Sequence, residues 1–538
     1  MNYKTKKLKV AIIINKPSFF NWQKEIVDYV KNSSSLELAL CINNLDVKTP
    51  KKIPLLWKVF LKLDNRFFNP SPYALSKYDF GTYFKDVPLI DYSNGINNKQ
   101  LNDFDIDVVV NLIDSDLPKA LLKTSKYGIW FLTHCDLDNV GKKPYGIWEM
   151  ISKKPESVAV LRYIKNNMHY PATIDKTSSC TDGLSYKRNI NSLLWQSHML
   201  VINNLNLLAT NKYLFEKKLD THKEVFANKE MDVSYQPPNN FKTLKYVLSL
   251  YFKKLAQLLQ SMFYFNQWAL IFLNSNGEKN PYNLKDYKTV LPPKDRFWAD
   301  PFLIKENGKC YLFIEELIYK NKLGHLSVME IDENGIYTKP KKILEKDYHL
   351  SYPFVFKDND EYYMIPETSG NKDIQLYKAI NFPLDWELQE TLMDNVVAVD
   401  TTIYKKDDTY WMFTSQRNHK GASKNVELFL YSSKHLISNN WKPHPLNPII
   451  RDVKTARPAG GFFIRDNKLF RPSQDCSHHY GYGLNILEII KLTENDYEER
   501  LELKMIPNWD KKINSTHTLN SVNDIFISDV KLKRNRFF

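Results

Sequence analysis

The chain has 538 residues, of which 43% are hydrophobic, 25% are charged and 14% are aromatic, and its formal net charge is +14. This length exceeds one ordinary hydrophobic core, so two or more domains are expected, and the composition excludes extensive disorder. The positive charge favours anionic partners such as nucleotide sugars, acidic glycans or phospholipid surfaces.

Cysteine usage and hydropathy indicate where the chain resides. The five cysteines are scattered and show no C-x-x-C spacing, which argues against structural zinc and for a reducing compartment. The basic, then apolar N-terminus has a short apolar run followed by Asn15, Lys16 and Pro17, so a buried strand explains it better than a signal peptide. We expect a cytoplasmic protein at or near the inner face of the membrane, without a metal or a cofactor.

Residues 1–235 show the pattern of an α/β domain. Apolar runs at 9–15, 36–43, 105–113 and 128–134 alternate with stretches that suit helices. Such nearly continuous apolar strands predict a parallel sheet covered on both faces. No G-x-G-x-x-G follows the first strand, so a dinucleotide fingerprint is absent. Segment 48–75, rich in Lys, Pro and aromatics, is predicted to be a loop or an insertion.

A linker over 236–266 follows, and a helix is predicted from 241 to 272. Pro237 and Pro238 interrupt the chain before apolar residues recur at helical spacing among lysines. A basic amphipathic helix can lie on an anionic membrane surface. The alternative is a linker helix packed between two domains.

A repeated pattern dominates the remainder, 267–538. From Trp298 to Asp529 it recurs five times at intervals of roughly fifty residues, the last copy being weaker. In each clear copy a small or polar pair precedes an apolar run, a short turn and a second apolar, aromatic run, which predicts a β-hairpin. Intervening apolar runs supply outer strands: 325–332, 374–380 and 427–433. The spacing predicts a β-propeller with four-stranded blades.

Because innermost propeller strands start near the axis, the residues that open each repeat should converge on one polar mouth. These residues are Asp300, Tyr352, Asp400, Arg457 and His517.

Carboxylates at this mouth suggest glycosyl chemistry. Glycosyl cleavage or transfer needs one ionised carboxylate and one protonated acid, and Asp300, Asp400 and Glu367 are the catalytic candidates. Arg457 could clamp an anionic group, and Asp475 could also contact substrate. Glu315 and Glu316 close the first hairpin. The alternative is that acids at blade tips cap turns.

The motifs FWADPF, YMIPETS, VDTTIY, ARPAGG and RPSQDCS carry a family resemblance. From about 268 to 530 the chain closely resembles the N-terminal module of glucosamine inositolphosphorylceramide transferase family proteins, which is similar to the five-bladed propeller of family 43-type glycoside hydrolases. The resemblance implies that Asp300 matches the hydrolase base and Asp400 the residue that tunes the acid. Arg457 stands where a Glu would be sought, which argues against simple hydrolysis.

The stretch YGIWFLTHCDLDNVGKKPYGIWEMISKKPESVAVLRYI (127–164) resembles the Rossmann-like formyltransferase domain more weakly. His134 matches that family's catalytic histidine, which implies a pocket role. Leu132 replaces the family's Asn, and Asp175 is a poor substitute for its Asp. These departures argue against formyl transfer.

The leading hypothesis is a glycosyl transferase of cell-surface glycan, polysaccharide or glycolipid synthesis that takes a sugar or nucleotide-sugar substrate at the propeller. One alternative is a formyltransferase that modifies an amino sugar from a folate donor. The other is a non-catalytic glycan-binding scaffold. Nucleic acid is not expected as a partner, because Lys and Arg are dispersed.

Overall fold

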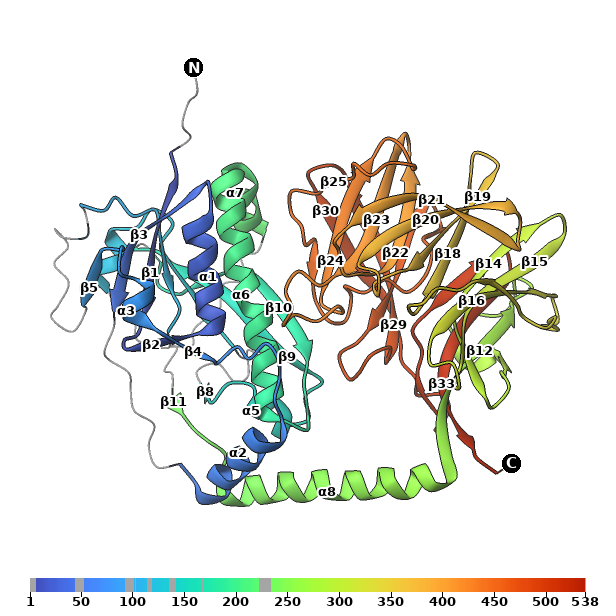
Figure 1. Ribbon diagram of the computed structural model, residues 1–538, viewed down its shortest axis with the longest axis horizontal. Helices are drawn as coiled ribbons and strands as arrows, with labels where there is room; N and C mark the ends of the chain where they lie inside the picture. Colours follow the sequence, from blue (N-terminus) through green and yellow to red (C-terminus); the bar gives the residue numbers. More distant parts are fainter. Residues whose placement is uncertain are drawn as a thin grey trace. The chain divides into compact units, whose positions relative to one another are not determined.

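The chain forms two compact units in the computed structural model (Figure 1). One unit comprises Met1–Tyr251 with His419–Ala422, and the other comprises Phe252–Asn418 with Ser423–Phe538. The structure describes these residues: 6–43, 53–91, 101, 103–113, 119–134, 142–166, 168–221 and 234–537.

The first unit is built on a seven-stranded sheet with the strand order β10-β9-β7-β6-β1-β3-β5. Neighbours from β7 to β5 are parallel, whereas β9 and β10 are antiparallel additions. Every side chain of Val10–Ile14 is fully buried, so both faces of β1 are covered. The predicted, mostly parallel α/β domain is confirmed, and the formyltransferase-type assignment stays a prediction. The strands are β1 Leu8–Ile14, β3 Leu36–Asn43, β5 Leu89–Asp91, β6 Val108–Asn111, β7 Ile129–Thr133, β9 Glu156–Ile164 and β10 Ala172–Cys180.

The segment 48–75, predicted to be a loop or an insertion, contains a helix, α2 (Leu55–Phe67). The buried Trp57 and the partly buried Phe60 and Leu61 recur at helical spacing and pack in one hydrophobic cluster, which fixes the helix. Residues 44–52 lie outside the described part of the chain. The unit's other helices are α1 Asn21–Asn32, α3 Phe80–Tyr83, α5 Ile147–Ile151, α6 Tyr186–Thr210 and α7 Lys212–Thr221, and its short strands are β2 Ser18–Phe20, β4 Lys77–Asp79, β8 Lys142–Lys143 and β11 Ser234–Tyr235.

The linker helix α8 spans Asn240–Phe263 and ends earlier than the predicted 241–272. The remainder forms β12 (Tyr264–Asn274), which pairs along its whole length with β33 (Ile525–Asn535). That tertiary pairing overrides the local helical pattern. Among the described residues, no helix is both long and apolar enough to cross a membrane.

The second unit is a five-bladed β-propeller, in agreement with the predicted fold. Each clear repeat forms the two inner strands of one blade, and the predicted outer runs lie in β16, β20 and β24. The first blade contains β14 Arg296–Glu306, β15 Lys309–Ile318, β16 Gly324–Ile331 and β17 Lys341–Leu344, and the second contains β18 Ser351–Asp358, β19 Glu361–Glu367, β20 Asp373–Asn381 and β21 Asp385–Asp394. The third contains β22 Ala398–Lys406, β23 Thr409–Gln416, β24 Glu427–Ser433, β25 Lys442–Pro443 and β26 Ile450–Arg451. The fourth contains β27 Phe463–Arg465, β28 Lys468–Asp475, β29 Gly483–Leu492 and β30 Tyr497–Met505.

The fifth blade joins the two ends of the propeller sequence. β12 is its N-terminal contribution, and β33 pairs with both β12 and β32. Its further strands are β13 Lys288–Val290, β31 Ile513–Ser515 and β32 Leu519–Val522. The ring is therefore closed by main-chain hydrogen bonds between its first and last strands.

Candidate functional site

A β-bulge recurs at the same place in three successive inner strands. The register shifts between Ala299 and Phe302 and at the matching points of β18 and β22. Asp300, Tyr352 and Asp400 lie in these bulges with φ of 49°, 46° and 51°. Left-handed backbone is uncommon for residues other than glycine, and bulges re-aim side chains next to active sites. The sequence repeat thus produces a repeated backbone distortion at the propeller mouth.

Asp300 is buried, and its carboxylate accepts hydrogen bonds from residues of two other blades. Its Oδ1 accepts a hydrogen bond from Thr518 Oγ1 at 2.9 Å, and its Oδ2 accepts one from the backbone amide of Tyr352 at 3.1 Å. His517 Nε2 lies 3.7 Å from Asp300 Oδ1. Burial raises the pKa of Asp300, and the neighbouring His517 opposes that shift.

His517 is held by a fully buried carboxylate, Asp529. Its Nδ1 lies 2.7 Å from Asp529 Oδ2, while Asp529 Oδ1 accepts hydrogen bonds from the amides of His517 and Thr518. Burial lowers the pKa of His517, but the carboxylates of Asp529 and Asp300 raise it to about 9. The imidazole is therefore positively charged at neutral pH, between two carboxylates. Trp268 stacks on its ring at 4.1 Å.

Asp300, His517 and Asp529 also form a group with the spacing of metal ligands. However, Asp529 Oδ2 already accepts a hydrogen bond from the Asp300 amide at 2.9 Å in addition to its contact with His517. His517 Nδ1 is likewise engaged by Asp529, and its Nε2 lies 3.7 Å from Asp300 Oδ1, too far for a hydrogen bond, so the three groups form a cluster of opposite charges.

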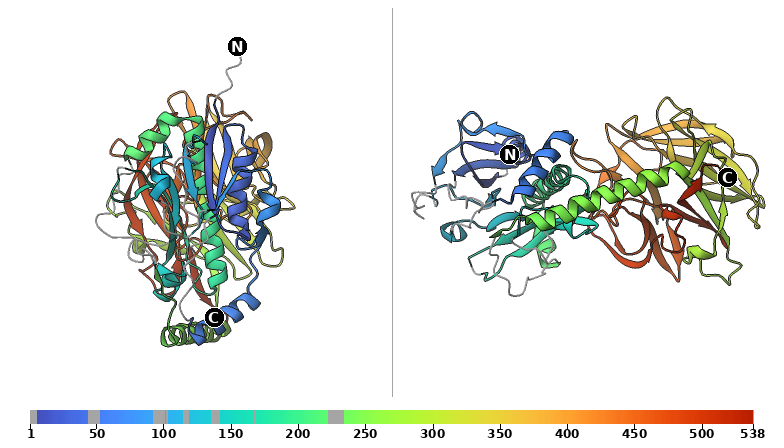
Figure 2. Two further views of the ribbon diagram at one scale, coloured as in Figure 1. Left: turned by 90° about the vertical axis from the view of Figure 1, so that its left-hand side faces the viewer. Right: turned by 90° about the horizontal axis from the view of Figure 1, so that it is seen from below.

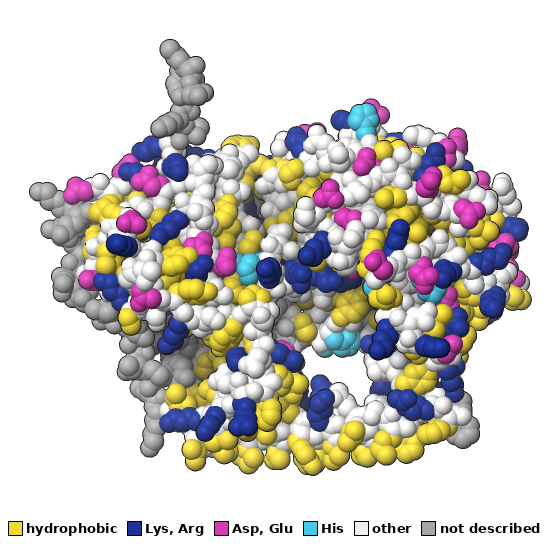
Figure 3. All heavy atoms as spheres, viewed as in Figure 1, with side chains coloured by type: hydrophobic (Ala, Val, Ile, Leu, Met, Phe, Trp, Pro, Cys, Tyr) yellow, Lys and Arg dark blue, Asp and Glu magenta, His cyan; other side chains and the backbone are white. Residues whose placement is uncertain are grey.

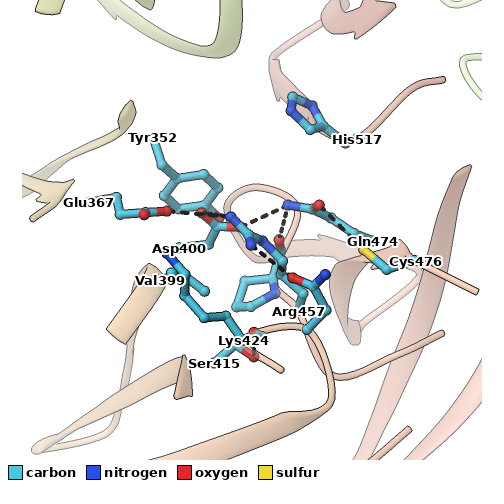
Figure 4. A network of polar contacts seen from close by, with 12 residues as sticks. Tyr352, Glu367, Val399, Asp400, Ser415, Lys424, Arg457, Gln474, Cys476 and His517 are labelled. Carbon is cyan, nitrogen blue, oxygen red and sulfur yellow. Dashed lines mark hydrogen bonds and ion pairs between the residues drawn. The ribbon is translucent and has the colours of Figure 1, made fainter. Parts of the chain in front are cut away.

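Arg457 connects two acidic residues on the other side of the mouth (Figure 4). Its Nε and Nη2 donate to the two oxygens of Asp400 at 2.6 and 3.2 Å, and Nη2 lies 3.4 Å from Glu367 Oε2. Gln474 Nε2 donates to Asp400 Oδ2 at 2.7 Å. Burial raises the pKa of Asp400, and the Arg457 guanidinium opposes that shift. The exposed Tyr480 ring lies 4.7 Å from the guanidinium carbon.

Glu315 is a further buried acid of the mouth. It pairs with Ala299 across the first hairpin, just as Glu367 pairs with Ser351 in the second. Glu315 Oε1 lies 3.0 Å from Nε2 of His349. Burial raises the pKa of Glu315 to about 7, with a smaller contribution from Asp300, and the hydrogen bond from His349 opposes it. Glu315 thus carries a proton over part of the neutral range, as a general acid requires.

The structure brings Asp300, Asp400, Glu367, Arg457 and His517 together at one end of the propeller channel. Asp300 and Asp400 are linked through Tyr352, whose amide bonds to Asp300 and whose hydroxyl contacts Thr402 at 2.9 Å in the blade of Asp400.

Three predicted substrate-binding residues have other local roles. The Tyr352 hydroxyl is buried, and it accepts a hydrogen bond from the Gly460 amide at 2.8 Å. Asp475 Oδ1 accepts a hydrogen bond from the Ser477 amide, as a turn cap does. His134 belongs to the first unit, where its Nε2 lies 2.9 Å from Ser197 Oγ. Substrate contact by these residues stays a prediction.

Glu315 was not among the predicted catalytic residues, although the sequence holds a signal for it. The first hairpin turns between Glu306 and Lys309, which pair with each other. Counting back along both strands from this turn places Glu315 beside Asp300. The dipeptide Glu315-Glu316 leaves it undecided which acid faces the channel, because adjacent strand residues point to opposite faces.

The propeller also contains a cavity of about 430 Å³, and none of the acids of the mouth lines it. Its lining includes residues that follow the bulges on the same strands, such as Phe302, Val355 and Ile403, together with Lys357 and Lys405.

Comparison with known proteins links the propeller to one family. Residues 288–531 match the family described as "Glucosamine inositolphosphorylceramide transferase 1, N-terminal". The transferase of that name from Oryza sativa subsp. japonica is 37% identical over 206 residues, which cover 38% of this chain and 27% of the relative. The Arabidopsis thaliana protein is 37% identical over 207 residues with the same coverage. The propeller is homologous to part of these transferases, and the chain spans 27% of their length.

Solved structures are similar to the propeller only weakly. A family 117 glycoside hydrolase from Zobellia galactanivorans has 11% identity and a TM-score of 0.33, covering 50% of this chain and 90% of its own. A GH43_1 enzyme from Xanthomonas citri has 9% identity and a TM-score of 0.32, covering 44% and 87%. No residue role is transferred from them.

Proposed function

We propose that the propeller binds a sugar donor and transfers its glycosyl unit during synthesis of a cell-surface glycan or glycolipid. The observation that carries this proposal is the pairing of two buried acids with different surroundings. Glu315, with a pKa of about 7, can hold a proton. Burial raises the pKa of Asp300 as well, but His517, whose Nε2 lies 3.7 Å from Asp300 Oδ1, opposes that shift and favours the carboxylate. Two acids in different surroundings can take the proton-donor and proton-acceptor roles of glycosyl chemistry.

In the proposed reaction, Glu315 donates its proton to the oxygen of the leaving group as the bond from that oxygen to the anomeric carbon breaks. Asp300 accepts the proton of the acceptor hydroxyl as the new glycosidic bond forms. His517, oriented by Asp529, favours the ionised form of Asp300. Glu367 is the weaker candidate for the acid, because its Oε2 is already engaged by the Arg457 guanidinium, whose Nη2 lies 3.4 Å away.

The names of the homologous transferases suggest the acceptor. They are described as acting on inositolphosphorylceramide, a lipid that carries a phosphate. A net charge of +14 suits an anionic acceptor or a nucleotide-sugar donor. We therefore include a phosphoinositol-bearing lipid at the inner face of the membrane as the proposed acceptor.

The test uses the purified full chain with a panel of nucleotide sugars and inositolphosphorylceramide, with the lipid product followed by mass spectrometry. We expect Glu315→Gln and Asp300→Asn to lower the rate by about 10²- to 10⁴-fold. The control Glu361→Gln replaces an exposed acid and should leave the rate unchanged. Full activity of both site variants would refute the assigned roles.

A second candidate is glycan recognition without turnover. The bidentate contact of Arg457 with Asp400 favours it, because that contact occupies a carboxylate that catalysis could otherwise use. Calorimetric binding of a sugar or glycolipid by the full chain, with no product on prolonged incubation, would support this function over transfer.

A further inference from the structure

Helix α8, whose course Figure 2 shows from below, exposes a continuous band of large hydrophobic side chains (Figure 3). Exposed fractions in this band lie between 39% and 74%. A contiguous apolar surface of this kind marks an interaction site on a soluble protein. The band consists of Phe241, Leu244, Val247, Leu248, Tyr251, Phe252, Leu255, Leu258, Leu259, Met262 and Phe263.

The first half of α8 is anchored by its opposite face. Thr243 and Tyr246 are buried, and the Tyr246 hydroxyl donates to the Gly183 carbonyl at 2.8 Å. The Tyr246 ring also lies 6.0 Å from that of Phe60 on α2. With 3.6 residues per turn, the exposed apolar side chains cover an arc of roughly 160°, away from this anchoring face. The band is therefore not the face by which α8 packs on its own unit.

The charges of α8 all have one sign. Its 24 residues contain Lys242, Lys245, Lys253 and Lys254 and no Asp or Glu. On a helical projection Lys245 and Lys254 border the apolar band on its two sides. Long lysine side chains in this position can hold their ammonium groups at the level of lipid headgroups while the apolar residues insert.

Helix α2, which packs against the first half of α8, repeats this composition. Four exposed apolar residues follow one another at four-residue intervals along it, and they alternate with three basic residues. The apolar residues are Leu55, Val59, Leu63 and Phe67, and the basic residues are Lys58, Lys62 and Arg66.

We propose that α8 lies in the plane of a membrane interface, with its apolar band inserted below the headgroups of a bilayer that contains anionic lipids. Apolar burial supplies part of the binding, and the lysines add attraction to negative headgroups. This proposal stands on α8 and does not depend on the chemistry of the propeller.

The first test is flotation of the full chain with vesicles of phosphatidylcholine alone and of phosphatidylcholine mixed with phosphatidylserine. The protein should float with the mixed vesicles. Leu255→Gln with Leu259→Gln should lower binding at least about tenfold, since two exposed apolar anchors are lost. The matched control, Leu388→Gln with Ile464→Gln, changes exposed residues of the propeller and should bind as the unaltered chain does.

The second test examines charge. Lys245→Glu with Lys254→Glu, the two lysines that border the band, should lower binding to the mixed vesicles by at least about fivefold per residue at low salt, whereas Lys320→Glu with Lys339→Glu, also exposed, should have little effect. Added salt should weaken the binding of the unaltered chain.

Three results would overturn the proposal. One is equal flotation of the Leu255/Leu259 variant and the unaltered chain. Another is binding that does not distinguish neutral from anionic vesicles. The third is a dimer in lipid-free solution that this variant dissociates, combined with absent flotation, because the band would then be covered by a second copy. Unchanged melting temperatures would show that the variants remain folded.

Discussion

Glu315 and Glu316 are adjacent on β15, but their side chains experience opposite environments. Glu316 accepts hydrogen bonds from Arg296 and Trp298 at 3.0 and 3.1 Å, and from Ser327 at 2.9 Å. Burial raises the pKa of Glu316, but these hydrogen bonds and the one from His325 outweigh burial and lower the pKa to about 2. One acid is therefore stabilised in its charged form, and its neighbour is stabilised in its neutral form.

This contrast predicts stability changes of opposite sign. Ionised Glu316 stabilises the fold by roughly 3 kcal/mol above pH 4.5, and that contribution is lost as the pH falls toward 2. Glu315 binds its proton more tightly when folded, so its ionisation lowers stability as the pH rises from 4.5 to about 7. In urea unfolding above pH 7, Glu316→Gln should destabilise the protein by about 3 kcal/mol, and Glu315→Gln should not destabilise it. Equal losses for both variants would contradict this assignment.

A second residue-scale prediction concerns pH and activity. If Glu315 is the acid, the transfer rate falls as the pH rises through about 7, where Glu315 loses its proton. The hydrogen bond from His349 lowers the pKa of Glu315, so His349→Ala should move this alkaline limb to higher pH. A pH–rate profile of both proteins checks the direction. An alkaline limb that does not shift in the His349→Ala variant would show that a group other than Glu315 causes it.

For single residues, the sequence predicted which side chains converge but not which partners each one contacts. The convergence of Asp300, Asp400, Glu367, Arg457 and His517 follows from the spacing of the repeats, because topology places equivalent strands side by side. The partners of each acid were not predictable. The side chains that contact each carboxylate, such as Arg457 beside Asp400, come from other blades and from the loops between them. No local sequence pattern encodes those contacts.

At the scale of elements, the bulges place the acids and Arg457 connects the blades. Arg457 precedes β27, and its guanidinium reaches Asp400 on β22, Glu367 on β19 and Asn425 before β24. A charge pair buried in this way contributes little net stability, whereas removal of one partner leaves a buried, uncompensated charge.

Arg457→Met should therefore destabilise the protein by about 3–5 kcal/mol at neutral pH. The same substitution in an Asp400→Asn background should cost much less, since the fully buried carboxylate is then gone and only the partly exposed Glu367 loses its contact with Arg457. Without Arg457, burial alone raises the pKa of Asp400 further above its unfolded value, so the penalty should shrink as the pH falls. A double-mutant cycle by chemical denaturation measures the coupling. Additive losses of unfolding free energy at all pH values would refute this coupling between Arg457 and Asp400.

Elements with a strict local period were predictable, and those defined by tertiary pairing were not. The hairpins of the repeat and the parallel strands of the first unit follow the predicted runs. α2 was missed because its apolar residues are interrupted by Lys and preceded by prolines. Residues after Phe263 continue a helical pattern, yet their pairing with β33 makes them a strand.

At the scale of the whole molecule, the propeller depends on closing its ring. β12 and β33 pair over eleven residues, from Tyr264–Asn535 to Asn274–Ile525. The side chains of Ala269 and Leu270 on β12, and of Ile527 and Val530 on β33, are fully buried. Removal of β33 would expose this core and leave β12 and β32 without their shared neighbour.

A chain ended at Asp524 should therefore lose the cooperative unfolding of the propeller, because an open ring exposes unpaired strand edges and apolar surface. A control chain ended at Arg536 keeps all eleven pairs and the hydrogen bond from the Arg536 amide to the Phe263 carbonyl, so it should melt as the full chain does. Near-ultraviolet circular dichroism and limited proteolysis compare the three proteins. A chain ended at Asp524 that melts at the temperature of the control would show that the other four blades hold the ring without closure.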